Sequence, residues 1–122
     1  MSMYLEGSVV INPTEDPEKD LRCIFNIFPD CDTVVTDVGI EFSTGNLDRF
    51  VEILTEQQIR DTALMVIGRE LEGDTARFHL NKQAAFMGYI NFTDGDSTLG
   101  DLSILVREGS RDLIEVIRPV LD

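Results

Sequence analysis

The sequence predicts an α+β fold, with a single mixed or antiparallel sheet and helices packed mainly on one of its faces. Segments with period-two alternation are interleaved with segments of helical spacing throughout the 122 residues. A hydrophobic content of 43% is sufficient for a packed core. No linker, internal repeat or low-complexity tract divides the chain, so we expect residues 1–122 to form a single α+β domain.

The N-terminal third predicts a strand, a helix and a second strand. Residues 3–11 alternate as in a strand. Asp16 is a good N-cap with Pro17 at the first helical position, and Pro29 ends the helix that follows. The apolar positions of this helix keep the spacing of a core-facing stripe: Leu21, Ile24, Phe25 and Phe28. Residues 33–44 alternate again and are expected to form one long strand.

Two helices are predicted next, over residues 47–54 and 59–67, with a break near Gln57. At the other end of the chain, residues 102–107 alternate as a last strand, and Ser110 is expected to cap a final helix. The apolar stripe of that helix is Leu113, Ile114, Ile117 and Leu121, and Pro119 is expected to kink it or end it early.

Residues 76–92 form the central unit of the sequence. They predict a strand over residues 76–80, a short helix over residues 82–87 and a strand over residues 89–92. Asn81 can cap the short helix, and Gly88 provides a left-handed stop. The predicted order of the whole chain is therefore β-α-β-α-α-β-α-β-β-α.

Charge is the most unusual property of the composition. Ten basic residues face 23 acidic ones, which gives a net charge of −13. Such a surface repels polyanions at low ionic strength and argues against a simple nucleic-acid binder. Adaptation to a salty cytoplasm explains the same composition equally well. The N-terminus lacks the features of a signal peptide and no apolar run is long enough to span a bilayer, so we expect a cytoplasmic protein.

Asp94, Asp96 and Asp101 are candidate oxygen ligands for Ca²⁺ or Mg²⁺. A calcium loop that begins at Asp94 needs glycine at its sixth position and glutamate at its twelfth, where this chain has Leu99 and Leu105. A solvated turn explains these aspartates better than a metal site does. We therefore expect no metal and no cofactor.

Catalytic patterns are also weak. The serines form no nucleophile elbow, and the glycines follow neither phosphate-loop nor dinucleotide spacing. Cys23 and Cys31 are expected to be reduced thiols. His79, Asp61 and Lys82 are the one polar combination that could serve a small-molecule enzyme. We expect a protein that is not an enzyme.

Several motifs together carry a resemblance to a known family. They are N-P-T-E-D-P-E-K (residues 12–19), I-R-D-T-A (59–63), L-N-K-Q-A-A-F (80–86), N-F (91–92) and L-G (99–100). In order and spacing they resemble an archaeal family, uncharacterised protein family 0201, which is described as RNA-binding and has relatives linked to exosome-type RNA processing. That family is similar in fold to the large-subunit ribosomal protein that carries 5S rRNA. Thr98 departs from the proline that relatives tend to have, and the acidity departs from what an RNA binder needs.

The resemblance implies a dimeric, non-catalytic module that binds structured RNA through the central unit and the exposed sheet face. The expected RNA-binding residues are Arg60, Arg77, Asn81, Lys82 and Gln83. The start of the short helix offers backbone N–H groups, a cation and an amide together. The competing structural role for Lys82 is a solvated first-turn residue or an ion pair with Asp61.

The alternative function is a homodimeric interaction protein with no role in nucleic-acid binding. In that case an open sheet face that exposes Phe42, Ile90 or Ile104 is covered by a second copy.

Overall fold

The computed structural model describes residues 3–97 and 99–118, which form six strands and five helices. In chain order they are β1 (Tyr4–Val10), α1 (Pro17–Ile27), β2 (Asp32–Val35), β3 (Gly39–Thr44), α2 (Asp48–Glu56), α3 (Arg60–Arg69), β4 (Ala76–Asn81), α4 (Lys82–Phe86), β5 (Phe92–Thr93), β6 (Asp101–Glu108) and α5 (Ser110–Ile117). Thr98, Pro119 and Leu121, which the sequence analysis singled out, lie outside the described residues.

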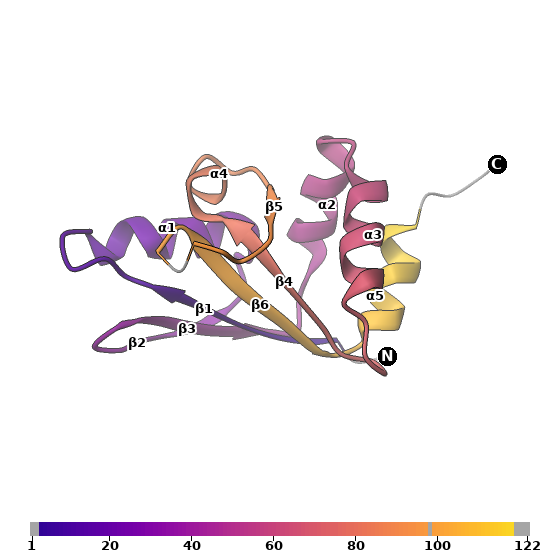
Figure 1. Cartoon of the computed structure of the whole chain (residues 1–122), viewed down its shortest axis with the longest axis horizontal. Helices are drawn as coiled ribbons and strands as arrows, with labels where there is room; N and C mark the ends of the chain where they lie inside the picture. Colours follow the sequence, from indigo (N-terminus) through magenta and orange to yellow (C-terminus); the bar gives the residue numbers. More distant parts are fainter. Residues whose placement is uncertain (1–2, 98, 119–122) are drawn as a thin grey trace.

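The six strands form one sheet in the order β2-β3-β1-β6-β4-β5, and every neighbouring pair is antiparallel. The helices lie on one side of this sheet, with α1 and α4 over one part of it and α2, α3 and α5 gathered over another (Figure 1). The predicted α+β class is therefore confirmed, and the sheet is antiparallel. Its second face is left without a covering layer among the described residues.

The core lies between the sheet and the helices. Because side chains alternate along a strand, Leu5 and Val9 of β1 point into the core while Glu6 and Ser8 point to the open face. A row of aromatic rings runs through the core with neighbouring centroids 5.7–5.9 Å apart: Phe42, Phe28, Phe50, Phe78 and Phe92. Such pairs add to the stabilisation from buried area.

The predicted exposure of Phe42, Ile90 and Ile104 is wrong. All three side chains are buried, with at most 3% of their surface accessible. Phe42 and Ile104 are on the core side of β3 and β6, because they share the face that packs against the helices. The open face therefore lacks the apolar side chains on which a face-to-face dimer was expected to rest.

Residues 33–44 form a hairpin instead of one long strand. The chain reverses at Thr36, whose backbone N–H donates to the carbonyl of Gly39 at 2.7 Å. The Thr36 hydroxyl oxygen also accepts from the N–H groups of Val38 and Gly39. A threonine side chain that satisfies the turn in this way replaces the Asn-Gly signal that usually marks a hairpin in a sequence.

Residues 89–92 were predicted to form a strand, but only Phe92 of that range is in β5. The reason is Gln57, which lies at the end of α2. Its side-chain oxygen accepts from Ile90 N at 2.7 Å, and its side-chain nitrogen donates to Ile90 O at 2.9 Å. A side-chain amide thus provides the two hydrogen bonds that a neighbouring strand would otherwise make.

The predicted cap of the last helix was also wrong. Asp74, from the loop before β4, accepts from the backbone N–H groups of Gly109 at 2.7 Å and Arg111 at 3.0 Å. The N–H groups of Arg111 and Gly109 hold the pKa of the Asp74 carboxyl below its usual value. Ser110 is buried and donates its hydroxyl to the carbonyl of Val106.

The helix of the central unit was predicted correctly. The Asn81 side chain accepts from Ala84 N at 2.9 Å, and Gly88 ends the turn with a φ of +83°.

Candidate nucleic-acid interface

Lys82 is buried in the fold, with 6% of its surface accessible. Its ammonium lies 2.8 Å from Glu15 Oε1 and 2.9 Å from Asp20 Oδ1, and it donates to the carbonyl of Val10 at 3.1 Å. The expectation of a solvated lysine, or of one paired with Asp61, is wrong. The three side chains form a triad of one cation and two carboxylates, which we call the Lys82 triad; Lys82 and Asp20 are buried, and the Glu15 side chain is 24% exposed.

Asp20 is the least satisfied member of the Lys82 triad. Its carboxylate is fully buried, and neither oxygen has a hydrogen bond of acceptable geometry to any residue in 3–97 or 99–118, despite the short distance to Lys82. Burial raises the pKa of Asp20, and the ion pair with Lys82 opposes that rise only in part. The hydrogen bond from Lys82 lowers the pKa of Glu15. For Lys82, burial works to lower the pKa, but Glu15 and Asp20 raise it overall.

The backbone N–H groups at the start of α4 are also used inside the fold. Lys82 N donates to Gly100 O at 2.8 Å, and Asn81 N donates to Asn91 O at 2.8 Å. Ala84 N is taken by the Asn81 side chain. Two N–H groups of the predicted anion site, those of Lys82 and Ala84, are therefore taken by the protein's own acceptors.

Helix α1 packs against α4 and holds it in place. Asn26 donates its side-chain amide to the carbonyls of Ala85 and Phe86, both at 3.0 Å. Cys23 donates its thiol to the carbonyl of Lys82 at 3.3 Å. Burial raises the pKa of the Cys23 thiol to about 11, so it remains protonated. Both contacts fall on one face of α1, at positions i and i+3.

The same face of α1 carries two cations onto α4. The Lys19 ammonium lies 5.4 Å from the centre of the Phe86 ring, and the Arg22 guanidinium lies 5.1 Å from it. These are cation–π distances. Neither side chain makes an ion pair with any residue in the described part of the chain. Lys19 and Arg22 are therefore positive charges that no carboxylate neutralises directly.

A groove of about 490 Å³ opens beside this contact, between α1, α4 and the segment that leads into β6. We call it the α1–α4 groove. Its lining residues are Glu15, Lys19, Cys23, Asn81, Lys82, Gln83, Phe86, Met87, Ser97, Leu99 and Gly100. The one carboxylate in this lining, Glu15, is already paired with Lys82. The groove thus combines apolar side chains, amides and an unpaired cation.

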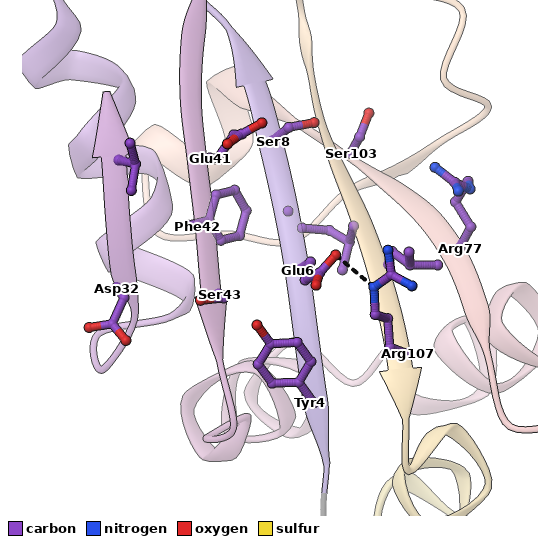
Figure 2. Close-up of a pocket in the computed structure, with 14 residues that line it drawn as sticks. Tyr4, Glu6, Ser8, Asp32, Glu41, Phe42, Ser43, Arg77, Ser103 and Arg107 are labelled. Atoms are coloured by element: carbon purple, nitrogen blue, oxygen red, sulfur yellow. Dashed lines mark hydrogen bonds and ion pairs between the residues drawn. The ribbon is translucent and has the colours of Figure 1, made fainter. Parts of the chain in front are cut away.

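The open face of the sheet has a second hollow, of about 540 Å³ (Figure 2). The register explains it, because Ser8 of β1 is opposite Ser103 of β6 and such small side chains leave space above the sheet. Asp32 and Glu41 are on the β2–β3 side of this hollow, and Arg77 is on β4 at the other side (Figure 2).

Arg107, on β6, also lies on the open face. It pairs with Glu6 at 2.7 Å (Figure 2), and this contact raises the pKa of Arg107. Its positive charge is therefore already matched by a carboxylate on the neighbouring strand.

The structure brings together only some of the predicted RNA-binding residues. Asn81, Lys82 and Gln83 all line the α1–α4 groove. Arg77 is exposed on the open face of the sheet, whereas Arg60 begins α3 in the helical layer on the opposite side. The expected cluster of Arg60, Arg77 and Lys82 therefore does not form.

The polar combination considered for an enzyme is also dispersed. His79 alternates with the buried Phe78 and Leu80 and faces the open side of the sheet. Asp61 is exposed in the first turn of α3, and Lys82 is buried under α1. Across residues 3–97 and 99–118, no three His, Cys, Asp or Glu side chains gather to hold a metal ion. No helix in these ranges is long and apolar enough to cross a membrane.

The sequence-based prediction of RNA-binding residues did not include the cluster of Lys19, Arg22 and Phe86. The sequence places Lys19 and Arg22 three residues apart on one helix, which is a visible signal. Phe86 is more than 60 residues away along the chain, and only the packing of α1 on α4 brings its ring under the two cations.

This architecture defines a class of α+β protein with one open antiparallel sheet and a groove at the edge of its helical layer. Residues 4–108 match a family model described as RNA binding. A UPF0201 protein of Methanothermobacter thermautotrophicus is 34% identical over 110 residues, covering 88% of this chain and 82% of that protein. The chain belongs to this archaeal family, UPF0201, as its motifs predicted.

Solved structures agree with this assignment. A UPF0201 protein from Methanococcus jannaschii has a TM-score of 0.85 at 28% identity, covering 98% of this chain and 95% of that one. Another UPF0201 crystal structure has a TM-score of 0.79 at 35% identity, covering 86% of this chain and 82% of that one. A UPF0200/UPF0201 protein of Archaeoglobus fulgidus is 38% identical over 107 residues, but this chain spans only 33% of its length. The predicted likeness to the 5S rRNA carrier stays a prediction.

Proposed function

We propose that this protein is a non-catalytic RNA-binding module and that the α1–α4 groove, with Lys19 and Arg22 at its side, is the surface that contacts RNA. The family model supports RNA as the ligand. An RNA partner also agrees with the cytoplasmic location expected from the sequence. The groove retains Asn81 and Gln83 of the predicted site, while Lys82 has a structural role beneath them.

The observation that carries this assignment is the pair of cations on Phe86. RNA affinity depends on cations that can exchange their counterions for phosphates, and a cation already paired with a carboxylate gains less from that exchange. In this chain Arg49 pairs with Glu52 and Glu56, and Arg107 pairs with Glu6. Lys19 and Arg22 have an aromatic ring as their neighbour instead.

The net charge of −13 limits the affinity but does not prevent binding at a local site. Long-range repulsion between exposed charges is screened beyond about 8 Å at physiological ionic strength. Lys19 and Arg22 would act on a bound phosphate at shorter range than this, and the one carboxylate in the groove lining, Glu15, is paired with Lys82. Contacts to sugar hydroxyls and bases from Asn81 and Gln83 depend little on salt and add to the phosphate contacts.

The experiment is a salt series of RNA affinity by fluorescence anisotropy, with a labelled RNA hairpin that carries a single-nucleotide bulge. Lys19→Ala with Arg22→Ala should weaken binding at low salt and reduce the log–log salt slope by about 1.4, because each lost phosphate contact on unpaired RNA accounts for about 0.7.

The matched control is Arg49→Ala with Arg69→Ala, which removes the same charge from cations that are already paired. We expect that control to change the affinity by less than about twofold. The proposed site is rejected if the Lys19/Arg22 variant and wild type have equal log–log salt slopes. It is also rejected if wild type does not bind the RNA.

An exposed edge strand of the sheet, rather than its open face, favours homodimerisation. Strand β2 is an edge of the sheet, and its Val34 and Val35 are 61% and 57% exposed. Its four residues contain neither lysine nor proline, the usual protections of an edge. We therefore place the proposed dimer contact at β2, where two copies can pair as antiparallel strands.

Sedimentation of wild type and Val34→Lys at several concentrations tests this contact. A concentration-dependent dimer that Val34→Lys converts to monomer supports pairing at β2. A wild-type monomer throughout rejects the dimer, and a dimer that resists the substitution rejects this interface.

A further inference from the structure

We propose that the α1–α4 groove receives one unpaired base of the RNA, so that the protein selects single-stranded or bulged RNA over a continuous duplex. This inference rests on the proposed function, because it names the class of RNA for the same groove. It narrows the expected ligand from structured RNA in general to RNA that carries an unpaired base.

The apolar part of the groove is the first reason. Met87 is 67% exposed and Leu99 is 47% exposed, and both line the groove beside Phe86. A phosphate or a ribose gains little from thioether and aliphatic carbon, whereas a base that leaves the stack has two apolar faces to bury. A volume of about 490 Å³ is in the range of sites that hold small organic ligands.

The polar groups of the groove are the second reason. The Gln83 side chain is exposed and makes no hydrogen bond to any residue in the described ranges. Its amide can donate and accept at once, as the edge of a base requires. Within those ranges the Ser97 hydroxyl, in the same groove, also has no partner. These groups offer hydrogen bonds beside an apolar surface, which is the pattern of a site that orients a planar heterocycle.

The position of the cations is the third reason. Lys19 lines the groove, and the Arg22 guanidinium lies 5.1 Å from the centre of the Phe86 ring, which also lines it. Phosphates on either side of an inserted base would therefore meet two positive charges at the rim, while the base occupies the space inside. In an A-form duplex the bases remain stacked and paired, so none of them can enter a groove of this kind without being extruded.

The test compares three RNA hairpins that share the same stem: one with a single-nucleotide bulge, one with an abasic residue at the bulge, and one fully paired. The abasic hairpin keeps the phosphates and the distortion but lacks the base. For wild type we expect the bulged hairpin to bind about tenfold more tightly than either of the others, because stacking of one base has an effect of this size.

Met87→Ser should reduce that preference, with Met65→Ser as the matched control. Met65 is 61% exposed on α3 and does not line the groove, and Met87 is 67% exposed, so neither substitution threatens the core. Lys19→Ala with Arg22→Ala should weaken all three hairpins together, because those contacts are to phosphates.

The outcomes separate the two proposals. Equal affinity for the three hairpins, with a uniform loss in the Lys19/Arg22 variant, overturns the unpaired-base inference and leaves the RNA-binding function standing. Equal loss of the bulge preference in Met65→Ser and Met87→Ser also overturns it. If wild type binds none of the three, both the function and the inference are wrong.

Discussion

The corner where α1 packs on α4 and the open face of the sheet differ in what surrounds their charged residues. At the corner, Lys82 is buried between two carboxylates, and Lys19 and Arg22 stay outside with only an aromatic ring beside them. On the open face, Arg107 is paired with Glu6, whereas Arg77 makes no ion pair with any residue in the described ranges and has no aromatic ring beneath it.

This contrast shows that the net charge of a chain says little about any one surface. Acidic residues are numerous here, and two of them are used to hold Lys82 inside the fold. Which cations remain available to a polyanion is decided by local pairing. Substitutions at Lys82, Asp20 and Arg77 test how far the two regions differ.

The largest expected effect is that of Lys82→Met. Removing the ammonium leaves the buried Asp20 and the partly exposed Glu15 without their cation, and the loss of one partner from a buried ion pair costs about 3–5 kcal/mol of unfolding free energy. Arg77→Met on the open face removes the same charge from an exposed side chain and should change the free energy by less than about 0.5 kcal/mol. Urea unfolding at neutral pH measures both.

The cost of Lys82→Met should shrink at acidic pH, since protonated carboxyls need no cation. An unfolding free energy for Lys82→Met that stays within experimental error of wild type at neutral pH would mean that the triad is not buried as described.

Asp20→Asn is expected to change the free energy of unfolding by less than Lys82→Met does, and in the opposite direction. The pKa of Asp20 is raised by burial, so the folded state disfavours its charged form, and an uncharged amide of the same shape should leave stability unchanged or raise it by about 1 kcal/mol at neutral pH. Urea unfolding of wild type and variant across a pH series measures the difference.

The stability difference between Asp20→Asn and wild type should depend on pH, and the direction of the Asp20 pKa shift gives its sign. A raised pKa stabilises the fold below the ordinary value of 3.8, and that stabilisation is lost as the pH rises through the folded-state pKa of Asp20. The advantage of Asp20→Asn should therefore grow with rising pH. Glu15 behaves in the opposite way: its lowered pKa stabilises the fold above 4.5, and this is lost as the pH falls. If Asp20→Asn is much less stable than wild type at neutral pH, the proposed destabilising effect of the Asp20 charge is wrong.

The smallest expected effect is that of Arg77→Ala on RNA affinity. Arg77 is on the face of the sheet opposite to the helices, away from the α1–α4 groove, so the bulged hairpin should bind within about twofold of wild type. Anisotropy in the same salt series provides the measurement. A loss as large as that of the Lys19/Arg22 variant would move the RNA site to the open face and remove the contrast between the two regions.

Much of the fold could be predicted because its signals are local. Asp16 and Pro17 begin α1, and Asn81 and Gly88 bound α4, in each case through contacts within a few residues. The errors arose where a distant side chain replaced a local signal. Gln57 takes the hydrogen bonds of Ile90, and Asp74 caps α5 from another part of the chain.

The same distinction between local signals and distant contacts applies to the candidate site. The sequence alone determined the α+β class, the short helix at residues 82–86, the family and the polar run from Asn81 to Gln83, because periodicity, capping and motifs are written in neighbouring residues. Only the tertiary structure decided that Lys82 points inward and that Lys19 and Arg22 lie on Phe86. A lysine's environment depends on which elements pack around it, and no local pattern specifies the packing of α1 on α4.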